Sequence, residues 1–63
     1  MSNAKLAALL RRYDAATQKM QYYGMQYEEE RVRYHNAILD ALDALGVYYS
    51  DRWDAISTAR RLA

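Results

Sequence analysis

Apolar side chains recur every seven residues along most of the chain, from Leu6 to Leu45. One heptad position holds Leu6, Tyr13, Met20, Tyr27, Tyr34 and Ala41. The positions three and four residues later begin with Leu9 and Leu10 and repeat in the same way. A repeat of this length is typical of a helix that packs lengthwise against another helix. The pattern therefore predicts one amphipathic, coiled-coil-like helix over residues 4–45, about 60 Å long.

Gly24 is the one position at which this helix would break. A break there would place Lys19 near the end of one helix and the three glutamates at 28–30 in the first turn of the next, and both placements suit the helix dipole. Residues 21–27, however, contain no Ser, Thr, Asp, Asn or Pro to cap a second helix. A lone glycine within a helix costs only about 1 kcal/mol. We therefore expect one long helix, with a three-helix arrangement broken at Gly24 as the alternative.

A second, shorter helix is predicted over residues 51–62. Gly46 is placed to end the long helix, as Ser2 or Asn3 is to cap its start. Ser50 or Asp51 then caps the short helix, which ends with two arginines. We expect the short helix to fold back onto the long one. The residues predicted to anchor it are Ile38, Leu42, Leu45, Trp53 and Ile56. The prediction is a single all-α domain over residues 1–63.

The small size of the chain points to a partner. With 63 residues, it buries only about 60% of the surface of its unfolded form, so its core is marginal. Domains of this size usually gain stability from disulfides, a metal or oligomerisation. There is no cysteine and only one histidine, so we expect neither disulfide nor metal site. Self-association remains. We predict a homodimer in which the packing stripe between chains is Leu6, Leu9, Tyr13, Met20, Tyr27 and Tyr34.

Catalytic patterns are weak, and we expect no enzyme and no cofactor. Nucleophilic catalysis needs a nucleophile beside a base, but the spacing of the hydroxyl residues and His35 suggests no such pair. The glutamates at 28–30 are consecutive, so on a helix they diverge by about 100° each. No glycine-rich phosphate loop is present in the sequence. His35 is expected to be a solvated or partly packed helix residue, with a pH switch as the alternative.

The charge balance argues against a polyanionic partner and against a membrane. Nine Lys and Arg against eight Asp and Glu give a net charge of +1, which creates no long-range field. The longest apolar run, Leu6 to Leu10, is far shorter than the roughly 20 residues that span a bilayer. No export signal is recognisable. The expected location, by default, is the cytoplasm.

Residue types enriched at protein interfaces are unusually frequent. The chain has seven Tyr, three Met and one Trp but no Phe, and most of its basic residues are Arg. Several of them fall outside the packing stripe, on a second flank of the helix or in the connector. This set is predicted to form a protein-binding surface, and it comprises Tyr22, Met25, Arg31, Arg33, Tyr48 and Tyr49.

The best functional hypothesis from sequence is a small protein–protein interaction module that acts as an adaptor, regulator or inhibitor. Its size and economy are typical of phage- or plasmid-encoded regulators. Arginine alternating with tyrosine is also how single-stranded nucleic acids are held, so a nucleic-acid-binding regulator is the first alternative. A structural assembly subunit, for instance of a virion, is the second.

Overall fold

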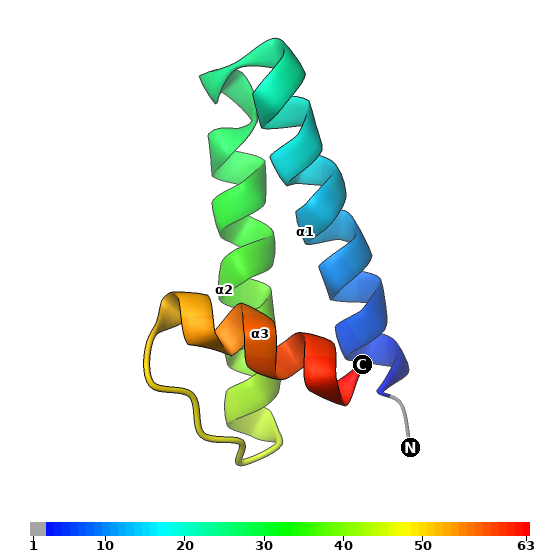
Figure 1. Ribbon diagram of the computed structural model, residues 1–63, viewed down its shortest axis with the longest axis vertical. Helices are drawn as coiled ribbons and strands as arrows, with labels where there is room; N and C mark the ends of the chain where they lie inside the picture. The colour runs from blue at the N-terminus through cyan, green and yellow to red at the C-terminus, as the bar shows by residue number, and fades with distance from the viewer. Residues whose placement is uncertain (1–2) are drawn as a thin grey trace.

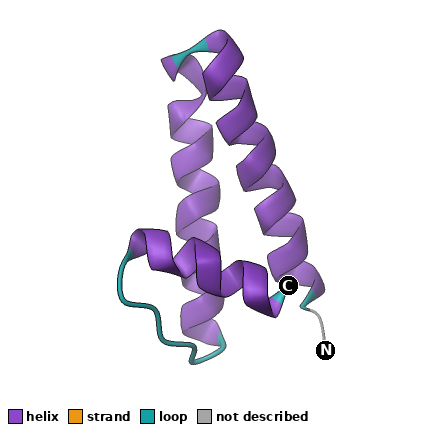
Figure 2. Ribbon diagram, viewed as in Figure 1, coloured by secondary structure: helices purple, strands orange, loops and turns teal. Residues whose placement is uncertain are grey.

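The computed structural model describes residues 3–63, which form three α-helices and one short 3₁₀ turn (Figure 1). The α-helices are α1 (Ala4–Tyr23), α2 (Glu28–Ala44) and α3 (Arg52–Leu62), and the 3₁₀ turn is η1 (Met25–Tyr27). Helices α1 and α2 form an antiparallel hairpin, and α3 crosses both of them (Figure 1). The part of the chain that the structure describes contains no strand (Figure 2). The predicted all-α class is confirmed.

The prediction of one continuous helix over residues 4–45 is wrong, and the break at Gly24 is what the structure shows. Gly24 has φ +85° and ψ −162°, a backbone conformation that is essentially confined to glycine. Its N–H donates to the Met20 carbonyl at 2.9 Å and so closes α1. Helix α2 begins after η1 without a side-chain cap, since Tyr27 makes no capping hydrogen bond. The hairpin gives each helix a partner within the chain, and this burial outweighs the missing cap.

The packing stripe predicted to lie between two chains is largely buried within one chain. From α1, Leu6 and Tyr13 are buried, and Leu9 packs at the edge of the same core. Tyr34 of α2 packs there as well. The full core cluster is Leu6, Leu10, Tyr13, Ile38, Ala41, Leu42, Ala55, Ile56 and Ala59. Met20 and Tyr27, nearer the turn, are only half-buried. The stripe is correct as a packing surface, but its partner is the other half of the same stripe.

Three of the five predicted anchors join α3 to the hairpin. Ile38, Leu42 and Ile56 are buried, whereas Leu45 is 51% exposed and Trp53 65% exposed. Leu45 fails as an anchor because α2 ends at Ala44 and the chain then turns away. Trp53 fails because the buried face of α3 is formed by residues 55, 56, 58 and 59. Trp53 instead lies at the edge of the contact between α2 and α3.

Asp51 and Asn3 cap helices as the sequence predicts. The Asp51 carboxylate accepts hydrogen bonds from the N–H groups of Trp53 at 2.9 Å and Asp54 at 2.7 Å, at the start of α3. The Asn3 side chain accepts from Leu6 N–H at 3.1 Å, at the start of α1. Ser2, the other predicted cap, lies outside the described residues. These caps determine where α1 and α3 begin.

His35 connects all three helices from inside the core. It is 1% exposed, so the expectation of a solvated or partly packed histidine is wrong. Its Nε2 lies 2.7 Å from the Arg52 carbonyl oxygen in the first turn of α3, and because a carbonyl only accepts, Nε2 carries the donated proton. The ring also lies edge-on to Tyr13 of α1 and against Trp53 of α3, with centroids 5.5 and 5.3 Å apart. One side chain thus fixes the start of α3 against the hairpin.

The other end of α3 is held to α1 by polar contacts. Arg60 donates two hydrogen bonds to the Asp14 carboxylate, at 2.7 and 3.0 Å. The Asn3 N–H donates to the Leu62 carbonyl at 3.1 Å. Helix α3 is therefore fixed at both ends, to α2 through His35 and to α1 through Asp14.

We expect His35→Ala to lower the free energy of unfolding by about 2–4 kcal/mol, because it removes a buried hydrogen bond and leaves a cavity between three helices. Urea unfolding followed by circular dichroism measures the change. Arg33→Ala, an exposed position on the same helix, is the control and should change stability by less than about 0.5 kcal/mol. Equal effects of the two substitutions would show that His35 does not connect the helices.

The Asp14–Arg60 pair makes stability depend on pH. The hydrogen bonds from Arg60 hold the pKa of Asp14 below its ordinary value of 3.8, and partial burial opposes this only in part. A carboxyl whose folded pKa is lowered contributes stability above its unfolded pKa, and this contribution is lost as the pH falls through the folded pKa. Both side chains are about half exposed, so we expect Asp14→Asn to cost only about 0.5–1 kcal/mol at neutral pH. The difference from the unmodified protein should begin to shrink below about pH 4 and disappear once the pH lies below the folded pKa of Asp14.

Thermal unfolding across a pH series tests this expectation. Asp40→Asn is the matched control, since Asp40 is exposed and makes no ion pair within residues 3–63. A loss for Asp14→Asn that persists unchanged in acid would contradict the assignment.

Candidate protein-binding groove

Helix α3 covers only part of the α1–α2 hairpin. It has 11 residues, against 20 in α1, and it crosses the half of the hairpin that lies away from the Gly24 turn (Figure 1). Next to α3, on the half nearer the turn, lies an open groove of about 340 Å³. Its lining residues are Tyr13, Thr17, Met20, Gln21, Arg31 and Trp53. We call this site the groove. It exists because α3 crosses the hairpin instead of running along it, so α3 covers one helix width and leaves the part nearer the turn open (Figure 1).

The α1 side of the groove offers mainly apolar contact. Tyr13 is buried below it and Met20 is half-buried, and a thioether adapts easily to the shape of a ligand. Thr17 donates its hydroxyl proton to the Tyr13 carbonyl at 2.9 Å, so this proton is already used within the helix. Gln21 is exposed beside them and is the one amide of the lining. This wall can therefore bury an apolar side chain, and a partner would also have to accommodate the Gln21 amide.

Trp53 forms the α3 wall of the groove. Its ring lies against the buried His35 ring, with centroids 5.3 Å apart, while 65% of the residue stays exposed. Its backbone N–H is fixed by the Asp51 cap. A large aromatic side chain supported from behind loses little conformational entropy when a partner covers it. Tryptophan is also among the residues most enriched in binding hot spots.

Arg31 supplies the positive charge of the groove. Its side chain is only 16% exposed, and it is the one lining residue with a formal charge. Its Nη2 lies 3.9 Å from a Glu28 carboxylate oxygen, which is too long for a hydrogen bond. A guanidinium has five N–H donors in a planar fork that suits carboxylates. Arg31 can therefore bind a carboxylate at the edge of an otherwise apolar site.

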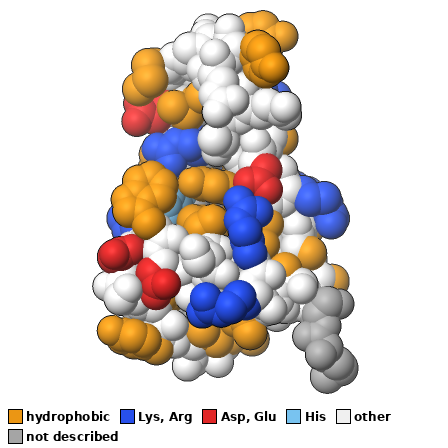
Figure 3. Space-filling model, in the orientation of Figure 1, with side chains coloured by type: hydrophobic (Ala, Val, Ile, Leu, Met, Phe, Trp, Pro, Cys, Tyr) orange, Lys and Arg blue, Asp and Glu red, His pale blue; other side chains and the backbone are white. Residues whose placement is uncertain are grey.

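A second exposed cluster lies at the turn of the hairpin. Tyr22, Tyr23 and Met25 are 77%, 66% and 65% exposed, and we call them the tip cluster. Figure 3 shows apolar side chains gathered at the end of the molecule that carries this turn. The Tyr23 ring is supported on one side by the Tyr27 ring, at 5.8 Å. Tyr22 and Met25 are therefore exposed together, as the sequence predicts.

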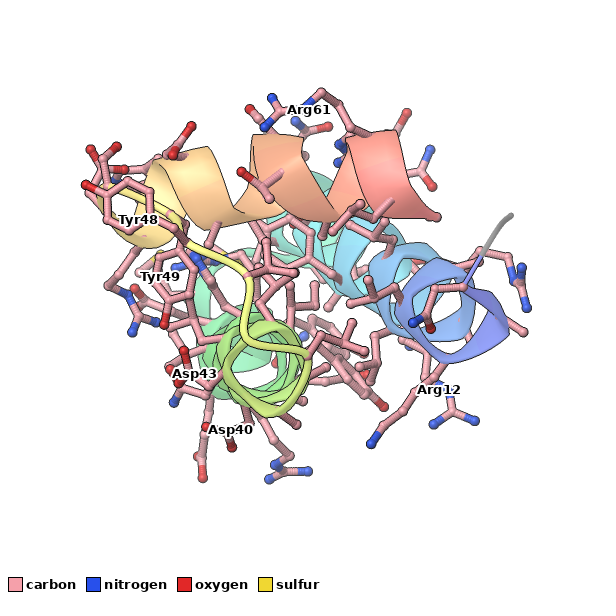
Figure 4. All side chains as sticks on the ribbon, turned by 90° about the horizontal axis from the view of Figure 1, so that it is seen from below. Arg12, Asp40, Asp43, Tyr48, Tyr49 and Arg61 are labelled. Atoms are coloured by element: carbon pink, nitrogen blue, oxygen red, sulfur yellow. The ribbon has the colours of Figure 1, made fainter. Side chains whose placement is uncertain are left out.

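The six residues predicted to form one protein-binding surface do not lie together. Tyr22 and Met25 belong to the tip cluster, and only Arg31 lines the groove. Arg33 is exposed on α2, with a Glu29 oxygen at 4.0 Å. Tyr48 and Tyr49 lie in the connector between α2 and α3, at the opposite end from the tip cluster (Figure 4). The prediction of a single surface is wrong because the hairpin separates its members.

The two connector tyrosines differ in environment. Tyr48 is 84% exposed, whereas Tyr49 is half-buried and donates its hydroxyl proton to Asp43 at 2.9 Å (Figure 4). That hydrogen bond raises the pKa of Tyr49, because the nearby carboxylate disfavours the phenolate. Tyr49 therefore holds the connector against α2, and Tyr48 is the free side chain of the pair.

The groove was not predicted from the sequence, where Trp53 is expected to be a core anchor. No local pattern in the sequence reveals it, because the uncovered part of the hairpin depends on the direction in which α3 crosses α1 and α2 (Figure 1). The side chains of that part, such as Thr17 and Gln21, look like ordinary surface residues in the sequence.

The basic residues near the tip are paired with glutamates. Lys19 lies 3.9 Å from Glu30, and the two arginines of α2 lie within 4.0 Å of Glu28 and Glu29. Lys19 also lies over the Tyr27 ring, 5.4 Å from its centroid. Around Lys19, Arg31 and Arg33, the surface that combines basic residues with tyrosines is thus of mixed charge. A phosphate backbone bound there would compete with these carboxylates.

Two further searches of residues 3–63 gave no site. No group of three or more His, Cys, Asp or Glu side chains in this range is placed to hold a metal ion. Within the same range, every helix is too short or too polar to cross a membrane.

The chain was compared with protein-family models, with curated proteins and with solved structures, and it matches none of them. The fold and the groove are therefore the grounds on which a function can be argued.

Proposed function

We propose that this protein is a protein–protein interaction module whose groove binds one amphipathic helix of a partner protein. The observation that carries the proposal is the open groove beside α3, where a supported Trp53 and Met20 face solvent next to Arg31. The tip cluster extends the available apolar surface toward the end of the hairpin.

A helix fits this site because of how the three helices are arranged. The groove runs beside α3, over two antiparallel helices, and is open to solvent. Side-chain ridges of a further helix pack into such grooves, and helix-in-groove binding is a common mode of peptide recognition. A partner helix would extend over the rest of the hairpin the layer that α3 begins.

The charge of the groove selects among amphipathic helices. Arg31 favours an acidic residue next to the apolar anchors of the partner, because its side chain is only 16% exposed and Glu28, at 3.9 Å, makes no hydrogen bond with it. The groove has no acidic lining residue to oppose that carboxylate. We therefore expect a partner helix with large apolar residues at i, i+3 or i+4, and i+7, and with an Asp or Glu beside them.

A protein partner suits the charges better than a nucleic acid does. Lys19, Arg31 and Arg33 each have a glutamate within 4.0 Å, and the net charge of the chain is only +1. Proteins that bind polynucleotides usually present an unneutralised basic surface. A small module that covers one helix of another protein would act as an adaptor, a regulator or an inhibitor.

Selection from a displayed library of helical peptides tests the proposal. We expect enrichment of sequences with the apolar spacing given above and an adjacent acidic residue. Binding should shift the fluorescence emission of Trp53, the only tryptophan, to the blue, because the partner covers its ring. Trp53→Ala should weaken the selected peptides about 30-fold, the effect of losing a hot-spot side chain. The anisotropy of a labelled peptide measures this change.

Two further variants make the test specific. Tyr48→Ala removes a ring that is even more exposed but lies outside the groove, and it should leave affinity unchanged. Gln21→Glu adds a negative charge at the groove and should weaken acidic peptides, with little effect on folding because Gln21 is exposed. The proposal that the groove binds a helix would be refuted if no peptide were enriched, or if the selected peptides bound all variants equally. Binding of a polynucleotide that falls steeply with salt would favour the nucleic-acid alternative instead.

A further inference from the structure

The hairpin and a continuous helix use the same packing face. Leu6 and Tyr13 of α1, and Tyr34 and Ala41 of α2, are separated by multiples of seven residues, and all four pack inward. If the chain were straightened at Gly24, the inward faces of α1 and α2 would therefore lie on one side of a single helix. If the turn had a length that broke the seven-residue repeat, the inward faces of α1 and α2 would lie on different sides of the straightened helix.

The contacts of the hairpin are centred on Gly24. Lys19 lies opposite Glu30, and Tyr13 lies opposite His35. Along the sequence, the midpoint between the two residues of each pair falls at Gly24 or directly after it. Two straightened chains, placed antiparallel with their Gly24 residues side by side, would reproduce every contact between α1 and α2, now between chains. The Asp14–Arg60 pair would also form between chains, since α3 follows α2.

We propose that a second copy of this chain is a partner of the hairpin, and that the two copies exchange α1 helices in a domain-swapped antiparallel dimer. Each chain would contribute one continuous helix over residues 4–44. The two forms share the same packing contacts, so the equilibrium between them is decided at the hinge and by concentration. This inference does not depend on the peptide-binding function of the groove.

The hinge is built in a way that favours opening. It consists of Gly24 and the single turn η1, and short hinge loops promote exchange between copies. No side chain caps the start of α2, and the Glu28 N–H donates to the Met25 carbonyl of η1, so the first turn of α2 lacks the capping side chain and the i−4 partners that a continuous helix would supply. Only the glycine at position 24 allows the backbone conformation of the closed form, with φ at +85°.

Tyr23 gains a packing surface only in the dimer. It follows Ala16, which is fully buried, by one heptad, yet it is 66% exposed at the end of α1. In a continuous helix Tyr23 would lie on the packing face, beside the two-fold axis, and the second chain would cover it. Tyr22 follows the exposed Ala15 by one heptad and would stay in solvent. The two neighbouring tyrosines thus form a matched pair, since both are exposed in the hairpin.

The first experiment measures mass by light scattering after the protein has been unfolded and refolded at a series of concentrations. We expect a dimer of twice the chain mass to appear as concentration rises. Gly24→Ala should raise the association constant at least about a hundredfold, because alanine disfavours the closed turn and favours the continuous helix in both chains. Small-angle scattering should show a particle about 60 Å or more in length, the span of a 41-residue helix, in place of 34 Å.

Gly46→Ala is the control for backbone strain. Gly46 also has a positive φ, +70°, with open space around its α-carbon, but it lies outside the hinge. Its substitution should lower stability without increasing the dimer. In the Gly24→Ala background, Tyr23→Ala should weaken the dimer about tenfold or more, whereas Tyr22→Ala should not.

Crosslinking identifies the exchange itself. The chain has no cysteine, so Lys19→Cys and Glu30→Cys can be introduced in separate chains and refolded together. A short bismaleimide should then join unlike chains, because only a swapped dimer places position 19 of one chain beside position 30 of the other. Monomers at every concentration, for both the unmodified protein and Gly24→Ala, would overturn the proposal. A dimer without this crosslink would do so as well. Peptide binding by the dilute monomer would be unaffected by either result, so the two proposals can fail separately.

Discussion

The packing of α1 against α2 depends on the reversal of the chain at Gly24, where φ is +85°. A residue with a side chain rarely adopts that conformation, so the turn rests on this one glycine. Without it, the inward faces of the two helices would need another chain to cover them. The heptad repeat predicts packing between two chains. Because the chain reverses at Gly24, the two halves of the repeat pack against each other within one chain. The same repeat remains available for pairing with a second copy.

The direction in which α3 crosses the hairpin determines which part of the hairpin face stays exposed (Figure 1). Its buried residues cover the part of the hairpin away from the turn and form a compact core there. Nearer the turn, Met20 and Trp53 remain in contact with water beside the nearly buried Arg31. An apolar groove of this kind is costly for a chain with so small a core, and a partner helix would remove that cost. In the proposed complex, a partner helix would cover apolar residues that the core leaves exposed.

Two polar connections place α3 where it lies. His35 donates to the Arg52 carbonyl from within the core, and Arg60 reaches Asp14 at the surface. The first contributes more to stability, because a buried donor left unpaired costs more than an exposed ion pair gains. His35 also supports Trp53 from behind, so the residue that fixes α3 also shapes the groove. Fold and candidate site therefore share one side chain.

Features that depend on residues close together in the sequence could be predicted from the sequence. Heptad spacing identified the inward face of the helices, and the side chains of Asn3 and Asp51 identified their starts, since a cap involves only residues within one turn. The short helix was placed within a residue of its position for the same reason. The exposure of Tyr22 and Met25 also followed from their position off the packing stripe.

Tertiary structure decided the remainder, because it depended on distances between segments that no local pattern contains. A straight helix and a hairpin differ in the backbone conformation of a single glycine, Gly24. Burial of apolar side chains over the whole chain decides between them. The burial of His35 and the exposure of Trp53 depend on where α3 crosses α2. The groove arises from the direction in which α3 crosses the hairpin (Figure 1). Sequence alone thus indicated the inward stripe of the two long helices, and only the folded arrangement decided what that stripe faces and whether His35 and Trp53 are buried.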